Sequence, residues 1–192
     1  MSVVELNQAP APIGLTGEQY DLLVEHGMFD HRHIELIDGE VFEMSPMNDA
    51  HAMAIKLANY ALLRAYPPDR FTVQIQCPMR LGESSRPEPD LAVVSGSPRE
   101  QSSHPRSALL VVEVSDSTLE FDRTMKAQIY AAAGIAEYWI VNLNDRRVEV
   151  RRTPIQAGDA SRYDEAKTLT PGESISPLSA ASAIIAVNEL LP

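Results

Sequence analysis

The sequence predicts one α/β (α+β) domain, and three observations lead to this class. The chain has 192 residues, of which 44% are hydrophobic, so it can bury one sizeable core. Short apolar runs typical of central strands occur at 91–94, 109–114 and 138–143. Helical patterns precede and separate them, at 48–65 and 115–133. We expect residues 16–192 to form this domain and residues 1–15 to form a tail or arm.

The N-terminal part of the domain predicts a short helix and then a β-hairpin. Thr16 and Gln19 have the spacing of a capping box, and the helix that they open is expected to end near Gly27. Farther on, the dipeptide at 38–39, Asp-Gly, separates two strand-like runs and predicts a two-residue hairpin turn. The hairpin places Glu35 on one of two paired strands.

The next elements are a longer helix and a strand. Asn48 or Asp49 can cap the helix, and the prolines at 67–68 end it. Its apolar spacing predicts one buried stripe, made of Met53, Leu57, Tyr60 and Ala61. Apolar and polar residues then alternate over 71–77, which is typical of a strand with one solvated face.

The C-terminal half contributes a helix and two further strands. Within the helix at 115–133, Asp122, Lys126 and Tyr130 are four residues apart and therefore share one face. The strand at 138–143 is expected to pair with 147–152 across a turn at Asn144-Asp145. Beyond it we expect a loop at 154–166, a turn at Pro171-Gly172, and a terminal element at 183–191 that packs Ile184, Ile185 and Leu190.

Composition limits the classes of function. The formal net charge of -11 argues against tight, generic DNA binding, which draws on lysine and arginine at phosphates. The sequence contains no run of about 18 apolar residues and no signal-peptide pattern, so we expect a soluble cytoplasmic protein. Cys77 is the only cysteine, which rules out an internal disulfide framework.

Two acids on neighbouring apolar strands and one lysine suggest a divalent-metal site. Asp90 begins one strand, Glu113 lies near the end of another, and Lys126 projects from the following helix. A charge inside Leu-Leu-Val-Val-Glu-Val is unfavourable unless it is paired or bound to metal. With the backbone carbonyl of Val114, the acids offer the oxygen ligands that phosphodiester hydrolysis by a divalent ion needs, and the lysine would hold water or phosphate.

Simpler interpretations of the same residues stay open. Asp90 after a proline can be a turn residue, and Glu113 can form an ordinary salt bridge. Asp122 with Lys126 is typical of a surface pair four residues apart on a helix. A histidine in the first turn of a helix, such as His51, is as often a surface residue as a substrate contact. Tyr138 and Trp139 lie in an apolar strand, which favours core packing over base stacking.

Several short motifs, taken in order, resemble one known family. They are Glu35-Leu36-Ile37-Asp38-Gly39-Glu40, Met44-Ser45-Pro46, His51, Pro89-Asp90, Val112-Glu113-Val114-Ser115, Asp122 with Lys126 and Tyr130, and Glu137-Tyr138-Trp139-Ile140-Val141. Over residues 16 to 190 the chain resembles the Uma-two family of restriction-endonuclease-like proteins.

The resemblance implies the PD-(D/E)xK nuclease fold, a mixed sheet flanked by helices. It assigns the metal-binding acids to Asp90 and Glu113 and adds Glu35 as a further acid. The general nuclease motif has a lysine two residues after the second acid, where this chain has Ser115. The family relocates this lysine to the following helix, which corresponds to Lys126.

The leading hypothesis is a Mg²⁺-dependent DNA endonuclease, with Mn²⁺ able to substitute, that works as a homodimer by analogy with enzymes that cut both strands. Asp90, Glu113 and Lys126 would be catalytic; the auxiliary candidates are Glu35, His51, Asp122 and Tyr130. Two alternatives remain: a non-catalytic binding or assembly module that keeps the fold, and a metal-dependent hydrolase of another phosphoester.

Overall fold

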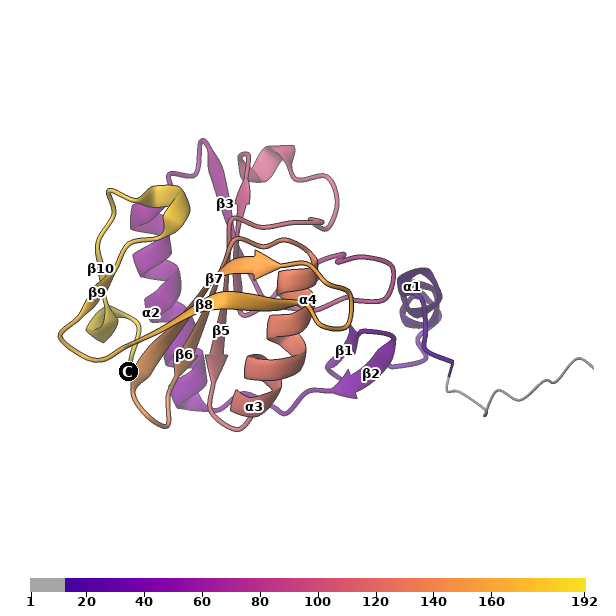
Figure 1. Ribbon diagram of the computed structural model, residues 1–192. Coiled ribbons are helices and arrows are strands. Elements are labelled where there is room, and N and C mark those ends of the chain that lie inside the picture. Colours follow the sequence, from indigo (N-terminus) through magenta and orange to yellow (C-terminus); the bar gives the residue numbers. More distant parts are fainter. Residues whose placement is uncertain (1–12) are drawn as a thin grey trace, which may run out of the picture.

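A six-stranded mixed sheet forms the centre of the computed structural model, which describes residues 13–192 (Figure 1). Its order follows the sequence, β3-β4-β5-β6-β7-β8, and every neighbouring pair is antiparallel except β5 and β6, which are parallel. The strands are β3 (Phe71–Ile75), β4 (Leu91–Ser95), β5 (Leu110–Ser115), β6 (Glu137–Asn142), β7 (Arg147–Ile155) and β8 (Arg162–Leu169). The predicted α/β class with a mixed central sheet is confirmed.

Helices cover both faces of this sheet (Figure 1). Helix α2 (Asp49–Ala65) packs on the face that carries Val112 and Trp139. The opposite face, with Val111 and Tyr138, is covered by a helical run that connects the parallel strands. This run consists of α3 (Leu119–Phe121), η2 (Asp122–Lys126) and α4 (Ala127–Ala132). The alternation of residues along β5 and β6 therefore divides the core into two layers.

The N-terminal helix and hairpin were predicted correctly. Helix α1 (Gly17–Glu25) opens with the capping box, in which Thr16 N donates to Gln19 Oε1 at 2.9 Å and Gln19 N donates to Thr16 Oγ1 at 3.2 Å. Strands β1 (Ile34–Ile37) and β2 (Glu40–Glu43) form a separate two-stranded sheet. The hairpin attaches to the rest of the chain through Arg86, whose N–H donates to Leu36 O at 2.7 Å.

Positive φ angles at both turn residues explain why Asp-Gly joins these strands. Asp38 has φ 50° and Gly39 has φ 85°, as the favoured two-residue hairpin turn requires. Gly39 also lies against the chain before α1: Leu15 N donates to Gly39 O at 2.9 Å. Of the tail predicted for residues 1–15, residues 1–12 lie outside the described residues.

Gly39→Ala is expected to lower the free energy of unfolding by about 2 kcal/mol, through backbone strain and crowding together. A Cβ at this position would lie 3.2 Å from the Cα of Gly14. Gly82 is a matched control, because its φ is also positive, 57°, but a Cβ added there would have no neighbouring atom within 4 Å. Gly82→Ala should lower stability by about 1 kcal/mol. Urea denaturation measures both, and equal losses would contradict a role for the contact with Gly14.

The predicted buried stripe of α2 is only partly correct. Ala61 is buried as predicted, but Met53 and Tyr60 are 47% and 69% exposed, and the helix also buries Ala54, Ile55, Ala58 and Leu62. The small alanines let the helix approach the sheet closely, Ile55 and Leu62 pack into the same core layer, and Met53 and Tyr60 point outward. Strand β3 also differs from expectation: it ends at Ile75, which is 41% exposed, and it buries Thr72.

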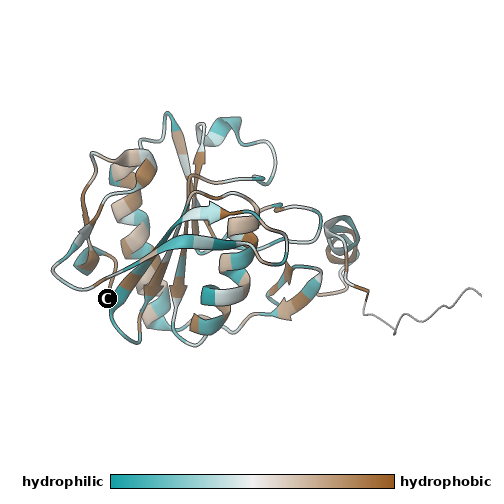
Figure 2. Ribbon diagram, in the orientation of Figure 1, coloured by the Kyte–Doolittle hydropathy of each residue, from teal (hydrophilic) through white to brown (hydrophobic). Residues whose placement is uncertain are grey.

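The C-terminal third contains two further corrections. The loop predicted at 154–166 is shorter than expected and spans 156–161, since β7 extends to Ile155 and β8 begins at Arg162. Strand β8 is an edge strand of largely hydrophilic residues (Figure 2), which hid it in the sequence. In the terminal element, Ile185 and Leu190 are buried as predicted, but Ile184 is 73% exposed.

Short elements complete the fold, beginning with η1 (Pro98–Glu100) after β4. After β8 come β9 (Ser174–Ile175), η3 (Leu178–Ala180), β10 (Ile185–Ala186) and η4 (Val187–Glu189). Residues of this last segment, including Ile175 and Val187, join the core layer of α2. Over residues 13–192, none of the helices has the length and apolar character needed to cross a membrane.

Candidate active site

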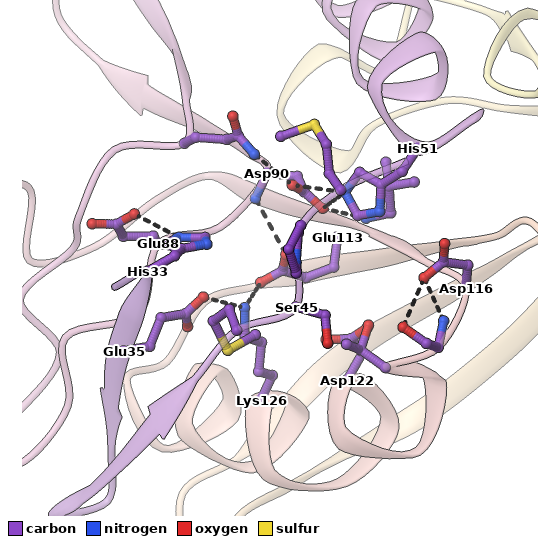
Figure 3. Close-up of a pocket in the computed structure, with 17 residues that line it drawn as sticks. His33, Glu35, Ser45, His51, Glu88, Asp90, Glu113, Asp116, Asp122 and Lys126 are labelled. Carbon is purple, nitrogen blue, oxygen red and sulfur yellow. Dashed lines mark hydrogen bonds and ion pairs between the residues drawn. The ribbon is translucent and has the colours of Figure 1, made fainter. Parts of the chain in front are cut away.

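A polar cavity of about 80 Å³ lies where the hairpin, the start of α2, the strands β4 and β5, and η2 meet (Figure 3). Residues that the sequence singled out from five separate segments line it together. They are Glu35, His51, Asp90, Glu113, Val114, Asp122 and Lys126. Tyr130 lies directly behind the cavity, where its hydroxyl donates to Glu113 Oε1 at 2.6 Å.

The two acids from the strands face each other because of the strand register. Leu91 of β4 is paired with Val112 of β5, so Asp90 and Glu113 are opposite one step farther along. Asp90 N donates to Glu113 Oε2 at 3.2 Å, and Val114 N donates to Asp90 Oδ2 at 2.8 Å. Each carboxylate is thus held by a backbone N–H of the other strand, and both residues are buried.

Lys126 lies at the centre of the acids. Its Nζ donates to Glu113 Oε1 at 2.9 Å and to Glu35 Oε1 at 3.0 Å, and the residue is only 2% exposed. Asp122 is equally buried at 2%, so the interpretation of Asp122 and Lys126 as a surface pair is wrong. Both belong to a π-helical turn, a rare geometry that is frequent at functional sites.

The pKa values of three buried acids of the cluster, Glu35, Glu113 and Asp122, are raised. Burial raises the pKa of Glu113 from 4.5 to about 8; the charge of Lys126 opposes this rise, and Asp90 adds to it. Burial likewise raises the pKa of Glu35 and of Asp122 against the opposing effect of Lys126. Burial lowers the pKa of Lys126 itself, but the neighbouring carboxylates outweigh it and hold that pKa well above its ordinary value. The cluster therefore contains more acid than its lysine can neutralise.

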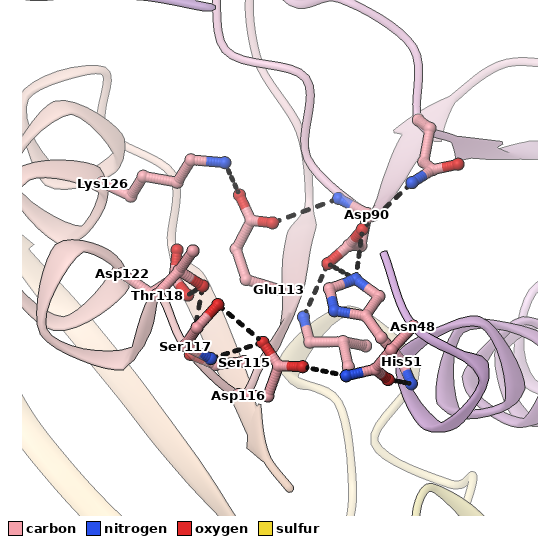
Figure 4. A network of polar contacts seen from close by, with 12 residues as sticks. Asn48, His51, Asp90, Glu113, Ser115, Asp116, Ser117, Thr118, Asp122 and Lys126 are labelled. Atoms are coloured by element: carbon pink, nitrogen blue, oxygen red, sulfur yellow. Dashed lines mark hydrogen bonds and ion pairs between the residues drawn. The ribbon is translucent and has the colours of Figure 1, made fainter. Parts of the chain in front are cut away.

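His51 projects from the first turn of α2 into the site, and it is not a surface residue. Its Nε2 lies 3.2 Å from Asp90 Oδ1, and its side chain is 15% exposed. Burial lowers the pKa of His51, but the hydrogen bond and charge of Asp90 outweigh this effect, so the net shift is upward. His51 and Asp90 form a second hydrogen-bonded pair beside that of Lys126, and this pair is an ion pair when the imidazole is protonated (Figure 4).

Ser115, two residues after Glu113 on β5, belongs to a hydroxyl network beside Asp122. It is fully buried, and its Oγ lies 3.5 Å from Thr118 Oγ1, which donates to Asp122 Oδ2 at 2.7 Å. This network holds Asp122 while Lys126, four residues on, reaches Glu113. Lys126 thus reaches Glu113 from the helix, whereas the hydroxyl of Ser115 is directed to Thr118.

Sequence reasoning missed two polar residues that support the site. Asn48 caps α2 by accepting from His51 N at 3.0 Å, and its Nδ2 donates to Asp116 Oδ2 at 2.6 Å across the cavity rim (Figure 4). Gln76 has φ 47° and donates from Nε2 to Asp90 Oδ1 at 3.4 Å. The Asn48 cap was visible in the sequence, but its contact 68 residues away was not.

The donor set suits a hard divalent cation by its chemistry. Asp90 and Glu113 offer carboxylate oxygens, and Glu35 Oε2 is buried without a hydrogen-bond partner in the described structure. An added positive charge would also offset the excess of acid. Within residues 13–192, no three His, Cys, Asp or Glu side chains stand in a ready metal-coordinating arrangement. Internal donors hold the carboxylates instead, so cation binding requires them to turn.

The fold and the sequence both have known relatives. A solved structure described as a putative nuclease belonging to DUF820, from Anabaena variabilis ATCC 29413, is similar with a TM-score of 0.70 and 15% identity. The match covers 92% of this chain and 97% of that one, and at this identity it shows the fold. No curated protein sequence matches the chain.

The family model named Uma2 and described as "Putative restriction endonuclease" matches residues 18–188. This span includes every residue that lines the cavity, from His33 to Lys126. The resemblance that the motifs indicated is thereby confirmed. Because the match extends over most of its length, the chain belongs to the Uma2 family.

Proposed function

We propose that this chain is a Mg²⁺-dependent endonuclease that hydrolyses DNA phosphodiester bonds, and that Mn²⁺ can replace Mg²⁺. The observation that carries the proposal is the meeting of Asp90, Glu113 and Lys126 in one buried cluster, although they come from two strands and a helix. Two acids and a lysine at one point supply ligands for a cation and positive charge for a phosphate. Cutting both strands of a duplex calls for two such sites, so we also propose a homodimer.

Each side chain has a defined part in this proposal. The carboxylates of Asp90 and Glu113 and the carbonyl oxygen of Val114 would hold the cation, which supplies Lewis-acid charge and an activated water when bound. Lys126 orients Glu113 and brings positive charge toward the phosphate, where negative charge increases in the transition state. His51 fixes the orientation of Asp90, and Tyr130 does the same for Glu113.

Asp90→Asn and Glu113→Gln are each expected to reduce plasmid cleavage with Mg²⁺ by about 10²-fold or more. Both changes keep the shape of the side chain and remove the charge that a cation requires. Glu43→Gln is a matched control with no expected effect, because the Glu43 side chain on β2 is 61% exposed and lies outside the cavity. The assay follows conversion of supercoiled plasmid to nicked and linear forms. Full cleavage by both site variants would contradict the assignment.

A smaller phosphoester is a second candidate substrate, favoured by the cavity of about 80 Å³ and by the net charge of -11. Small phosphodiesters, RNA and single-stranded DNA assayed beside plasmid distinguish this candidate from the first. A non-catalytic module is the third, favoured by the internal pairing of the acids with Lys126. Calorimetric titration with millimolar Mn²⁺ distinguishes this module from an enzyme, because a module without a working metal site gives no heat of binding.

A further inference from the structure

Helix α2 carries a second apolar stripe that faces away from the sheet. Met53, Tyr60 and Leu63 are 47%, 69% and 45% exposed, although the sheet-facing side of the same helix is fully packed. Large apolar side chains grouped on one exposed face indicate an interaction surface. We propose that this face is a homodimer interface, in which two copies of α2 pack antiparallel across a two-fold axis.

The order of residues along the stripe is self-complementary. Five residues follow one another at spacings of three or four and therefore share one side of the helix. They are Asp49, Met53, Leu57, Tyr60 and Arg64. In an antiparallel pair centred between positions 56 and 57, Asp49 of one copy lies opposite Arg64 of the other. In the same register Met53 lies opposite Tyr60. A two-fold axis repeats each contact, as an isologous interface requires.

These contacts are chemically favourable. An aspartate in the first turn meets an arginine in the last turn of its partner, and a thioether lies against an aromatic ring. Within one chain Arg64 pairs with Glu189, but the two side chains are 57% and 40% exposed. Such a surface pair is weak and leaves the arginine available to Asp49 of the second copy.

The charge of the molecule also favours this face. Two copies with a net charge of -11 each repel one another, so association is most favourable at a face where basic residues balance the acids. On this side of α2, the acids Asp49 and Glu189 are matched by Lys56 and Arg64. Nucleic acid is also negatively charged, and binding it here would need an excess of positive charge that this face does not have.

The size of the surface predicts a reversible dimer. Helix α2 has 17 residues and is therefore about 25 Å long. One helix pair of this length covers less than the about 800 Å² per partner that is typical of stable complexes. The dimer should therefore dissociate on dilution. This inference does not rest on the proposed nuclease activity, because association is measured without substrate or metal.

Sedimentation velocity over about a hundredfold range of protein concentration tests the interface. We expect a shift from monomer to dimer in the wild type, and Tyr60→Glu should weaken association at least about tenfold. Ile184→Glu is the matched control, because Ile184 is 73% exposed and lies on the C-terminal segment instead of α2. Thermal unfolding of both variants confirms that the monomer fold is retained. A monomer at every concentration would overturn the proposal.

Cross-linking tests the register independently. Position 56 lies next to the proposed axis, so Lys56→Cys in a Cys77→Ser background should give a covalent dimer with a short bis-maleimide. Glu18→Cys in the same background is the control, since Glu18 is exposed on α1 and far along the chain from the interface. Equal cross-linking of the two variants, or a dimer that survives Tyr60→Glu, would show that the copies associate elsewhere.

Discussion

Glu137→Ala is expected to lower the free energy of unfolding by about 4 kcal/mol, a large part of the stability of a domain this size. Glu137 is fully buried at the start of β6. Its Oε1 accepts from Trp139 Nε1 at 2.9 Å and from Arg152 Nε at 3.0 Å, and its Oε2 accepts from Leu178 N at 2.7 Å. Alanine would leave the half-buried guanidinium of Arg152 and two N–H groups without this acceptor.

Urea denaturation measures this loss. The fluorescence of Trp139 can follow unfolding, because it is the only tryptophan and its indole N–H donates to Glu137. Glu137→Gln should lower the free energy of unfolding by about 2 kcal/mol, less than Glu137→Ala does, because the amide keeps the shape and one acceptor oxygen. Glu25→Ala, at an exposed position in α1, is the matched control and should change stability by less than about 0.5 kcal/mol. A loss of stability below about 1 kcal/mol in Glu137→Ala would contradict the importance of the hydrogen bonds that Glu137 accepts.

Lys126→Met is expected to abolish cleavage and to destabilise the metal-free protein by about 3 kcal/mol at neutral pH. Methionine keeps most of the length of the side chain but removes the charge that Glu35 and Glu113 share. Lys167→Met, on the exposed part of β8, makes the same chemical change where no effect is expected. A folded Lys126→Met that cuts plasmid normally would exclude a catalytic part for this lysine.

The loss of stability in Lys126→Met should grow as the pH rises. The pKa of Glu113 is raised in the folded state, from 4.5 to about 8, so the folded protein binds the proton more tightly than the unfolded chain does. Its contribution to stability is therefore full below pH 4.5 and disappears as the pH rises toward about 8. Lys126 opposes this rise in pKa, and without it the carboxyl should resist ionisation still more. Urea midpoints measured with a chelator across this pH range give the comparison.

Local patterns predicted most of what depends on neighbouring residues. Asp38-Gly39 predicted the hairpin because both residues tolerate positive φ, and Thr16 with Gln19 predicted the start of α1. Glu113 was singled out because a charge in an apolar strand needs a partner. Lys126 was placed on the face of Asp122 and Tyr130 by helical spacing, and all three are buried there.

Long-range contacts explain what the sequence did not show. His51 reaches Asp90 across 39 residues, and no local pattern separates this contact from a surface position. Glu137 stands in the motif at 137–141, but its burial was not predicted, because its partners come from β7 and the C-terminal segment. Sequence spacing placed most of the buried stripe of α2 on the wrong side because the helix is apolar on two faces. Strand β8 was missed because an exposed edge strand has no buried face to produce alternation.

The separate hairpin has a consequence for how the protein is made. Glu35 and Lys126 are 91 residues apart, so at about 10 residues per second the acid leaves the ribosome roughly 9 s before the lysine that holds it. Until then Glu35, the buried acid of the β1–β2 sheet, lacks its ion pair with Lys126. We therefore expect the hairpin to complete its docking only after the helix between the parallel strands has emerged, although it is among the first elements to be synthesised.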